Sequence, residues 1–189
     1  MEGYYHTPES VEEYTHLAKD VSGIKLIEQI EPYLNASTTV LELGSGPGTD
    51  YEIFSKKYDV TGSDYSLEFL KALHRKFPKG DFLHLDASSL ITDGSYDLIY
   101  SNKVLHHLTD EQLVESFKSQ KEILNSGGVV AHSFWKGQGS ETFKGMFVNY
   151  HSQKELVNEY LNGFEIILMN EYQEFEPNDS IFIVAKKVG

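Results

Sequence analysis

The residues of this chain best suited to ligand chemistry lie within residues 40–50. There the apolar run Val-Leu-Glu-Leu is followed by glycines at alternate positions, Gly44, Gly46 and Gly48. Glycine has no Cβ, so the backbone can turn sharply and a ligand can approach it closely. Glu42 lies inside the apolar run, where a buried carboxylate needs a polar partner. The pattern predicts a ligand-binding loop of a kind that several nucleotide-binding folds share.

Two common phosphate-binding loops do not match this segment. The dinucleotide fingerprint has a third glycine where this chain has Thr49. A Walker-type loop ends in Gly-Lys-Ser/Thr, but the first lysine after the glycines is Lys56. Asp64, 20 positions after Gly44, ends a second apolar run. Because a carboxylate there can accept hydrogen bonds from two vicinal ribose hydroxyls, this acid indicates a ribose-containing ligand.

Three further apolar runs carry polar residues at their boundaries. The run at 82–85 ends in Asp86-Ala87, and the run at 96–101 leads through Asn102 into Val-Leu-His-His-Leu at 104–108. A fifth run follows Asn-Ser-Gly-Gly at 125–128. In an open parallel sheet, ligands lie outside the carboxyl ends of the strands. We therefore expect these polar residues to surround one crevice.

Taken in order, these five motifs resemble those of the class I S-adenosylmethionine-dependent methyltransferases, over roughly residues 36–188. The resemblance implies S-adenosylmethionine as cofactor and S-adenosylhomocysteine as product. It implies that Gly44 and Gly46 receive the methionine moiety, that Asp64 holds the ribose, and that Asp86 accepts from the adenine amine. The cofactor-binding residues expected on this basis are Glu42, Gly44, Ser45, Gly46, Gly48, Asp64, Tyr65, Asp86, Ala87, Ser101 and Asn102.

Simpler interpretations of two acidic residues stay open. Glu42 either meets the ligand through water or only braces the glycine loop. Asp86 either reads the adenine or merely caps a turn. Tyr65 is expected against the adenine face, and the Ala87 backbone is expected to face the ring.

His106 and His107 are the candidate catalytic residues. Neutral imidazole is a good general base near pH 7, and the pair follows the fourth strand at the rim of the crevice. The alternative is that one ring packs under the loop while the other is partly solvated. No metal site is expected, because adjacent histidines point in different directions and no acid lies at a suitable spacing.

The methyl-acceptor pocket is expected to form from two parts of the chain. His132 and Trp135 lie at the end of the fifth strand, and Tyr4, Tyr5 and Tyr14 belong to an N-terminal segment that resembles a lid over the cofactor. The alternative for that segment is a helix that only covers the core. Residues 141–150, where family members elaborate substrate recognition, are few, which favours a small-molecule acceptor.

The fold expected is α/β, a doubly wound, mostly parallel seven-stranded sheet with an antiparallel C-terminal hairpin, of the Rossmann-like methyltransferase type. Residues 1–189 are expected to form one domain, with 1–35 as a helical lid and 36–189 as the core. Helices are expected to start at the caps Thr7, Thr109 and Ser152, and Pro32 to kink or end an earlier helix. The strands expected are 38–43, 59–63, 82–85, 96–101, 127–135, 164–170 and 180–187.

Composition limits the partners. The formal net charge is −13, from 16 basic and 29 acidic residues, and there is no cysteine. Disulfides and cysteine nucleophiles are excluded, and binding to nucleic acid phosphates is disfavoured. The sequence shows no membrane-spanning run and no signal-peptide pattern, so a cytoplasmic location is expected. Oligomeric state is not predicted.

The function expected is transfer of a methyl group from S-adenosylmethionine to an oxygen, nitrogen or sulfur nucleophile of a small molecule. Two alternatives remain: methylation of tRNA or another macromolecule, and binding of S-adenosylmethionine without turnover.

Overall fold

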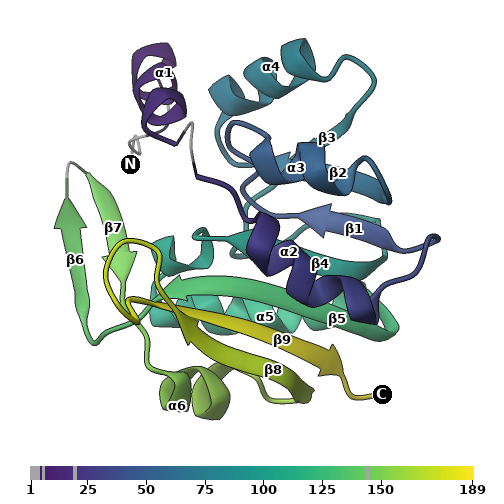
Figure 1. The fold of residues 1–189 in the computed structure, drawn as a ribbon, viewed down its shortest axis with the longest axis vertical. Helices are drawn as coiled ribbons and strands as arrows, with labels where there is room; N and C mark the ends of the chain where they lie inside the picture. Colours follow the sequence, from purple (N-terminus) through teal and green to yellow (C-terminus); the bar gives the residue numbers. More distant parts are fainter. Residues whose placement is uncertain (1–4, 6, 19–20, 144) are drawn as a thin grey trace.

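The computed structural model describes residues 5, 7–18, 21–143 and 145–189. Its centre is a seven-stranded sheet in the order β3-β2-β1-β4-β5-β9-β8, with a separate two-stranded hairpin, β6–β7, at one side (Figure 1). Strands β3, β2, β1, β4 and β5 are parallel, and β9 pairs antiparallel with both β5 and β8. The predicted fold class is confirmed.

The central strands are buried on both faces, as near-continuous apolar runs predict. Val40 and Leu41 of β1 and Leu98 and Ile99 of β4 are fully buried. The strands are β1 Thr39–Glu42, β2 Asp59–Asp64, β3 Asp81–His84, β4 Tyr96–Asn102, β5 Leu124–Trp135, β6 Ser140–Phe143, β7 Met146–Asn149, β8 Phe164–Tyr172 and β9 Ser180–Lys187.

Helices cover both faces of the sheet (Figure 1). On one face, Leu113 and Phe117 of α5 pack with the apolar side chains of β1, β4 and β5. On the other, Ile27 of α2 and Phe54 of α3 complete a second core. The helices are α1 Pro8–Leu17, α2 Ile24–Ile30, α3 Thr49–Phe54, α4 Leu67–Lys76, α5 Asp110–Ile123 and α6 Gln153–Glu155, with short helical turns at Glu31–Tyr33, Leu105–His107 and Leu156–Tyr160.

The predicted helix starts are confirmed. Thr7, Thr109 and Ser152 each accept a hydrogen bond from the backbone three residues later, and each completes a reciprocal capping box. Helix α2 ends at Ile30, and Pro32 lies in the helical turn that follows, so the proline does end the helix. Among the described residues, no helix combines the length and apolar character that crossing a membrane requires.

Two local features differ from the prediction. The fifth strand was expected over 127–135, but β5 begins earlier, at Leu124, and Gly127 within it adopts a positive φ of 74°. The helix expected after Ser152 does form, first as the short α6 and then as a π-helical turn, Leu156–Tyr160. The hairpin β6–β7 was not predicted, because β6 is exposed throughout and has no apolar alternation.

Gly48 lets the glycine loop pack against α4. It adopts φ 76°, and a Cβ there would lie 2.7 Å from Leu73 Cδ2 and 2.7 Å from Phe77 Cε2. Leu73 is 1% exposed, so it has little room to move away. Gly139 has nearly the same backbone, φ 74°, but a Cβ there would meet nothing within 4 Å.

We expect Gly48→Ala to destabilise the protein more than Gly139→Ala. Both variants incur the cost of a left-handed alanine, about 1–2 kcal/mol. Only Gly48→Ala also overpacks the core, which adds roughly 1–3 kcal/mol. Urea unfolding of the two variants measures the difference, and equal unfolding free energies would contradict this role for Gly48.

Candidate functional site

The candidate site lies at the carboxyl ends of β1 and β4, where the order of the strands reverses. Such a switch point is where open α/β sheets bind ligands. The loop after β1 approaches the end of β2, because the Gly46 N–H donates to Asp64 Oδ2 at 2.9 Å. The end of β2 also accepts a backbone hydrogen bond from Leu85, just after β3. The structure therefore brings together the loop, Asp64 and the segment of Asp86.

Gly46 forms the open part of this loop. Its φ is 48°, and a Cβ there would approach nothing closer than 4.0 Å, the Gly44 carbonyl oxygen of the same loop. Gly44 is different, because a Cβ there would lie 2.6 Å from Val104 Cγ2. Gly44 thus permits packing against the segment after β4, and Gly46 leaves backbone accessible to a ligand.

Asp64 holds the loop and the start of α4 together. Its Oδ1 accepts from the Ser66 N–H at 2.8 Å, while Oδ2 accepts from Gly46. The carboxylate is 9% exposed, and burial raises its pKa against the lowering effect of these backbone donors. The result is a shielded acceptor whose position is fixed by the loop and by the start of α4.

Glu42 is braced by the loop that it precedes. The Ser45 hydroxyl donates to Glu42 Oε2 at 2.6 Å, and Ser45 Oγ accepts from the Ser63 N–H at 3.1 Å. Burial, helped by the nearby charge of Asp50, raises the pKa of Glu42 from 4.5 to about 8. These contacts favour the interpretation of Glu42 as a brace for the loop.

Asp50 is a site residue that sequence reasoning did not identify. It lies in the first turn of α3 and is 7% exposed. Its Oδ1 accepts from the Gly23 N–H at 2.7 Å, and its Oδ2 accepts from Tyr100 OH at 2.8 Å and from Asn102 Nδ2 at 3.1 Å. An acid immediately after the glycines was the available signal. Asp50 joins the segment before α2 to the end of β4.

The predicted adenine side is more exposed. Asp86 Oδ1 accepts from both the backbone N–H and the hydroxyl of Ser88, which is the turn-capping geometry of the simpler interpretation. Tyr65 is 57% exposed and stacks on His84 with ring centroids 5.6 Å apart. Ala87 is partly buried against the α5-side core. A flat ligand therefore has an aromatic surface available beside these residues.

Ser101 and His132 lie inside the protein. Both are 1% exposed or less, and Ser101 Oγ lies 2.8 Å from His132 Nδ1. His132 Nε2 lies 2.7 Å from Gln120 Oε1 of α5, so Nε2 carries the proton and Nδ1 accepts from the serine. Burial lowers the pKa of His132 to about 3. His132 was expected in the acceptor pocket, but the structure places it in the core, because its strand position faces α5.

The two adjacent histidines differ in their surroundings. His106 is 3% exposed, and burial lowers its pKa well below the ordinary value. His107 is half-buried, and its Nδ1 lies 2.7 Å from the Phe147 carbonyl oxygen. Because a carbonyl only accepts, Nδ1 carries the proton and the neutral ring has its lone pair on Nε2. The structure thus fixes the tautomer of His107.

Trp135 forms part of an aromatic cluster beyond the histidines. Its ring stacks on Phe175 and lies 6.2 Å from His106, centroid to centroid. Lys103, in a left-handed conformation with φ 55°, places Nζ 3.6 Å from the Trp135 ring centroid. Burial lowers the pKa of Lys103 to about 7. Lys103 was also not identified from the sequence.

The N-terminal aromatics reach this region. The Tyr5 ring lies 5.2 Å from Tyr14 and 6.1 Å from His107. The pKa of Tyr14 is raised by burial, and then by the charges of Asp64 and Asp50, so α1 brings this hydroxyl near the loop carboxylates. Tyr4 lies outside the described residues. The arrangement brings Tyr5, Tyr14 and His107 together.

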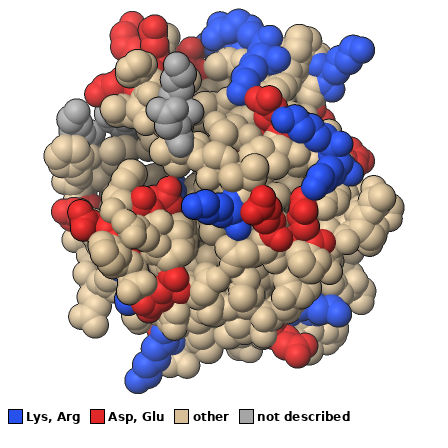
Figure 2. All heavy atoms as spheres, in the orientation of Figure 1, with Lys and Arg blue, Asp and Glu red and all other residues tan. Residues whose placement is uncertain are grey.

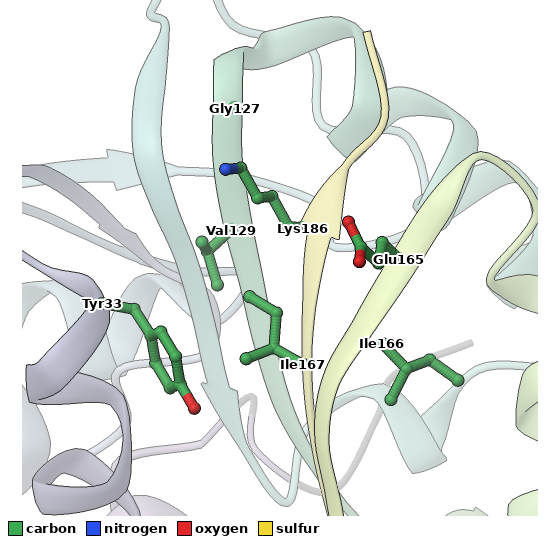
Figure 3. Close-up of a pocket in the computed structure, with 7 residues that line it drawn as sticks. All are labelled: Tyr33, Gly127, Val129, Glu165, Ile166, Ile167 and Lys186. Atoms are coloured by element: carbon green, nitrogen blue, oxygen red, sulfur yellow. The ribbon is translucent and has the colours of Figure 1, made fainter.

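A second hollow is separate from this site. It is lined by Tyr33, Gly127, Val129, Glu165, Ile166, Ile167 and Lys186 (Figure 3). Gly127 lies near the start of β5, whereas the glycine loop lies at the carboxyl end of β1. The hollow and the glycine loop therefore lie at opposite ends of the parallel strands.

We expect Glu42→Gln to become more stable relative to the wild type as the pH rises from about 5 to 8. The unfolded chain loses the Glu42 proton near pH 4.5, whereas the folded protein keeps it until about pH 8. The folded state thus binds more protons in this window, and its stability falls as pH rises. Glutamine still accepts from Ser45 and does not titrate.

Urea unfolding at several pH values measures this difference. Glu52→Gln, which replaces an exposed carboxylate on the neighbouring α3, is the control and is measured at the same pH values. A pH-independent difference for Glu42→Gln would contradict the raised pKa.

Comparisons with known proteins agree with this geometry. The sequence model of the methyltransferase domain family matches residues 40–128. Trans-aconitate 2-methyltransferase of Rhizobium rhizogenes is 32% identical over 94 residues, which cover 48% of this chain and 36% of that protein. The match thus spans about a third of the length of this curated relative.

Two solved structures share the fold. A S-adenosylmethionine-dependent methyltransferase from Clostridium acetobutylicum aligns with a TM-score of 0.78 and 17% identity, over 94% of this chain and 99% of that one. The 1,6-didemethyltoxoflavin-N1-methyltransferase of Burkholderia thailandensis, solved with 1,6-didemethyltoxoflavin and S-adenosylhomocysteine bound, aligns with a TM-score of 0.79 and 17% identity, over 96% and 85%. Together, the motifs, the sheet order and the domain model that matches residues 40–128 support a class I S-adenosylmethionine-dependent methyltransferase family for this chain.

Proposed function

We propose that this chain transfers a methyl group from S-adenosylmethionine to an oxygen, nitrogen or sulfur nucleophile of a small molecule. The observation that carries the proposal is the loop after β1, which Asp64 holds open at Gly46 directly beside the end of β4. Its position at the strand switch point is where a cofactor would lie in this fold.

The residues present fit this cofactor. A side chain at Gly46 would fill the space that the open loop leaves, and Asp64 supplies an acceptor of the kind that ribose hydroxyls need. Glu42, Asp50 and Asp64 are buried beside one another, and the charges of Asp50 and Asp64 both raise the pKa of Glu42. Acidic surroundings favour a cationic sulfonium over a pyrophosphate.

When bound, S-adenosylmethionine supplies an electrophilic methyl group on a sulfonium. The protein then has to align the acceptor with it and exclude water. Tyr5 and Tyr14 approach the site from α1 and its preceding residues, and they cover the side that faces His107. These contacts favour the interpretation of the N-terminal segment as a lid over the cofactor.

His107, rather than His106, is the candidate general base. Its Nδ1 donates to the Phe147 carbonyl, so the lone pair that can take a proton from an acceptor hydroxyl or amine is on Nε2. Burial lowers its pKa, which keeps the ring neutral at pH 7. His106 is more deeply buried and lies under the same turn, where it packs beside Trp135.

A small acceptor fits the surface better than a nucleic acid. Figure 2 shows basic and acidic side chains interleaved on the face that carries α3 and α4. There, Lys57 pairs with Glu31, and Lys76 pairs with Glu52. Lysines already paired with carboxylates contribute little to phosphate binding. The names of the trans-aconitate and toxoflavin enzymes, which denote small acceptors, support the same choice.

We expect S-adenosylhomocysteine to bind in calorimetry, with NAD and ATP binding far more weakly. Asp64→Ala removes the ribose acceptor and is expected to weaken binding roughly ten- to a hundredfold, from the loss of about 1.5–3 kcal/mol. Asp59→Ala, at the exposed other end of β2, is the control and should bind as the wild type does. Preference for NAD would overturn the proposed cofactor.

Turnover is then tested with labelled methyl donor and fractionated cell extract. Asp64→Ala, at a donor concentration that saturates only the wild type, is the low-activity control. Label in small metabolites supports the proposal. Label in RNA or protein would support the macromolecular alternative. Absence of transfer, with S-adenosylhomocysteine binding intact, would support a binding protein without turnover.

If His107 is the base, His107→Ala should reduce turnover about 10²- to 10⁴-fold and leave S-adenosylhomocysteine affinity unchanged. The wild-type rate should fall only below pH 6.5, because burial lowers the pKa of His107 from that ordinary value. His74→Ala, an exposed histidine of α4, is the matched control. A loss of melting temperature without loss of turnover would instead assign His107 a packing role.

A further inference from the structure

Acidic and histidine side chains from two distant parts of the chain, the start of α5 and the segment just after β7, lie close together. Asp110 is the first residue of α5, His151 follows β7, and Glu155 is the last residue of α6. One potential ligand atom from each residue lies within 4.8 Å of those of the other two. Nothing in the proposed methyl transfer uses this cluster.

His151 is the feature that needs an explanation. The residue is fully buried, and neither ring nitrogen has a hydrogen-bond partner among the described residues. An unpaired buried polar group costs about 1–3 kcal/mol, so such groups are rare unless a ligand satisfies them. Its ring is held edge-on between Phe134 and Tyr160, with centroids 5.5 and 5.6 Å away. The imidazole is thus fixed, and within the described part of the chain no group lies at hydrogen-bond distance from either ring nitrogen.

The distance between the His151 ring and the Glu155 carboxylate suits a shared ion. His151 Nδ1 lies 3.6 Å from Glu155 Oε1, too far for a hydrogen bond. Two ligand atoms that share a zinc ion at about 2.0–2.1 Å in tetrahedral geometry lie roughly 3.3–3.5 Å apart. The separation of these two atoms is therefore close to that of a pair of zinc ligands.

Asp110 is oriented for the same position by neighbours of the cluster. Its Oδ1 accepts from Asn149 Nδ2 at 2.7 Å and from Tyr160 OH at 3.0 Å. Hydrogen bonds of this kind hold carboxylate ligands in metal sites. One neutral imidazole and two carboxylates would also balance the charge of a divalent cation.

We propose that Asp110, His151 and Glu155 form a binding site for one divalent transition-metal ion of the zinc class. A histidine and two carboxylates are ligands that zinc accepts, and a water completes four-coordination. The ion would satisfy a buried nitrogen of His151 and relieve the repulsion between the two carboxylates.

The proposed ion has a structural role. Asn149 ends β7, and His107 is bonded to the Phe147 carbonyl in the same strand. An ion shared by Asp110 and His151 would fasten the hairpin β6–β7 to the start of α5. The strand that fixes the tautomer of His107 would then depend on the ion for its position.

The test is Zn²⁺ binding to the full chain, measured by metal analysis after dialysis and by calorimetry. We expect one Zn²⁺ per wild-type chain and a higher melting temperature with Zn²⁺ present. His151→Ala should abolish this stoichiometric binding, and His74→Ala, the exposed control, should retain it. Co²⁺ in place of Zn²⁺ should give a four-coordinate visible spectrum that His151→Ala loses.

Two conservative variants keep the test decisive if His151→Ala fails to fold. Glu155→Gln retains the capping box with Ser152, since glutamine serves at that position. Asp110→Asn retains an acceptor for Asn149 and Tyr160. Each should weaken Zn²⁺ binding at least tenfold. No binding to the wild type at 100 µM Zn²⁺, or unchanged binding in both variants, would overturn the proposal.

Discussion

Buried carboxylates beside the glycine loop are the constraint on which the site depends. Asp50 and Asp64 each accept hydrogen bonds from backbone N–H groups distant in sequence, and Glu42 accepts from the loop serine. Because these acids are desolvated, each requires its partners, and the partners define the path of the chain. The loop, the segment before α2 and the end of β4 are therefore fixed relative to one another.

Such a cluster is costly in isolation, since like charges in a buried site oppose each other. Protonation of Glu42, whose pKa is raised to about 8, relieves part of this repulsion at neutral pH. A cationic ligand would relieve it further, so the same feature that strains the unliganded loop favours binding of a sulfonium. Stability and ligand preference thus derive from one electrostatic arrangement.

Around His107, polar contacts between separate segments fix the geometry, in place of buried carboxylates. His107 obtains its tautomer from a carbonyl of the hairpin β6–β7, and the hairpin reaches α5 through Asn149 and Asp110. Little apolar surface holds the exposed strand β6, so polar contacts determine where the hairpin lies. The proposed zinc-class site at Asp110, His151 and Glu155 would strengthen that attachment.

Apolar periodicity, capping residues and glycines act locally, so the main sheet, the capped helix starts and the switch-point loop could be predicted from the sequence. The core position of His132, the three segments that Asp50 joins and the start of β5 at Leu124 depend on tertiary contacts that the sequence does not reveal. The tertiary structure also placed His151 against Asp110 and Glu155. The reason is physical: strand register selects which face a side chain occupies, and a buried polar residue takes its partners from segments far away in the chain.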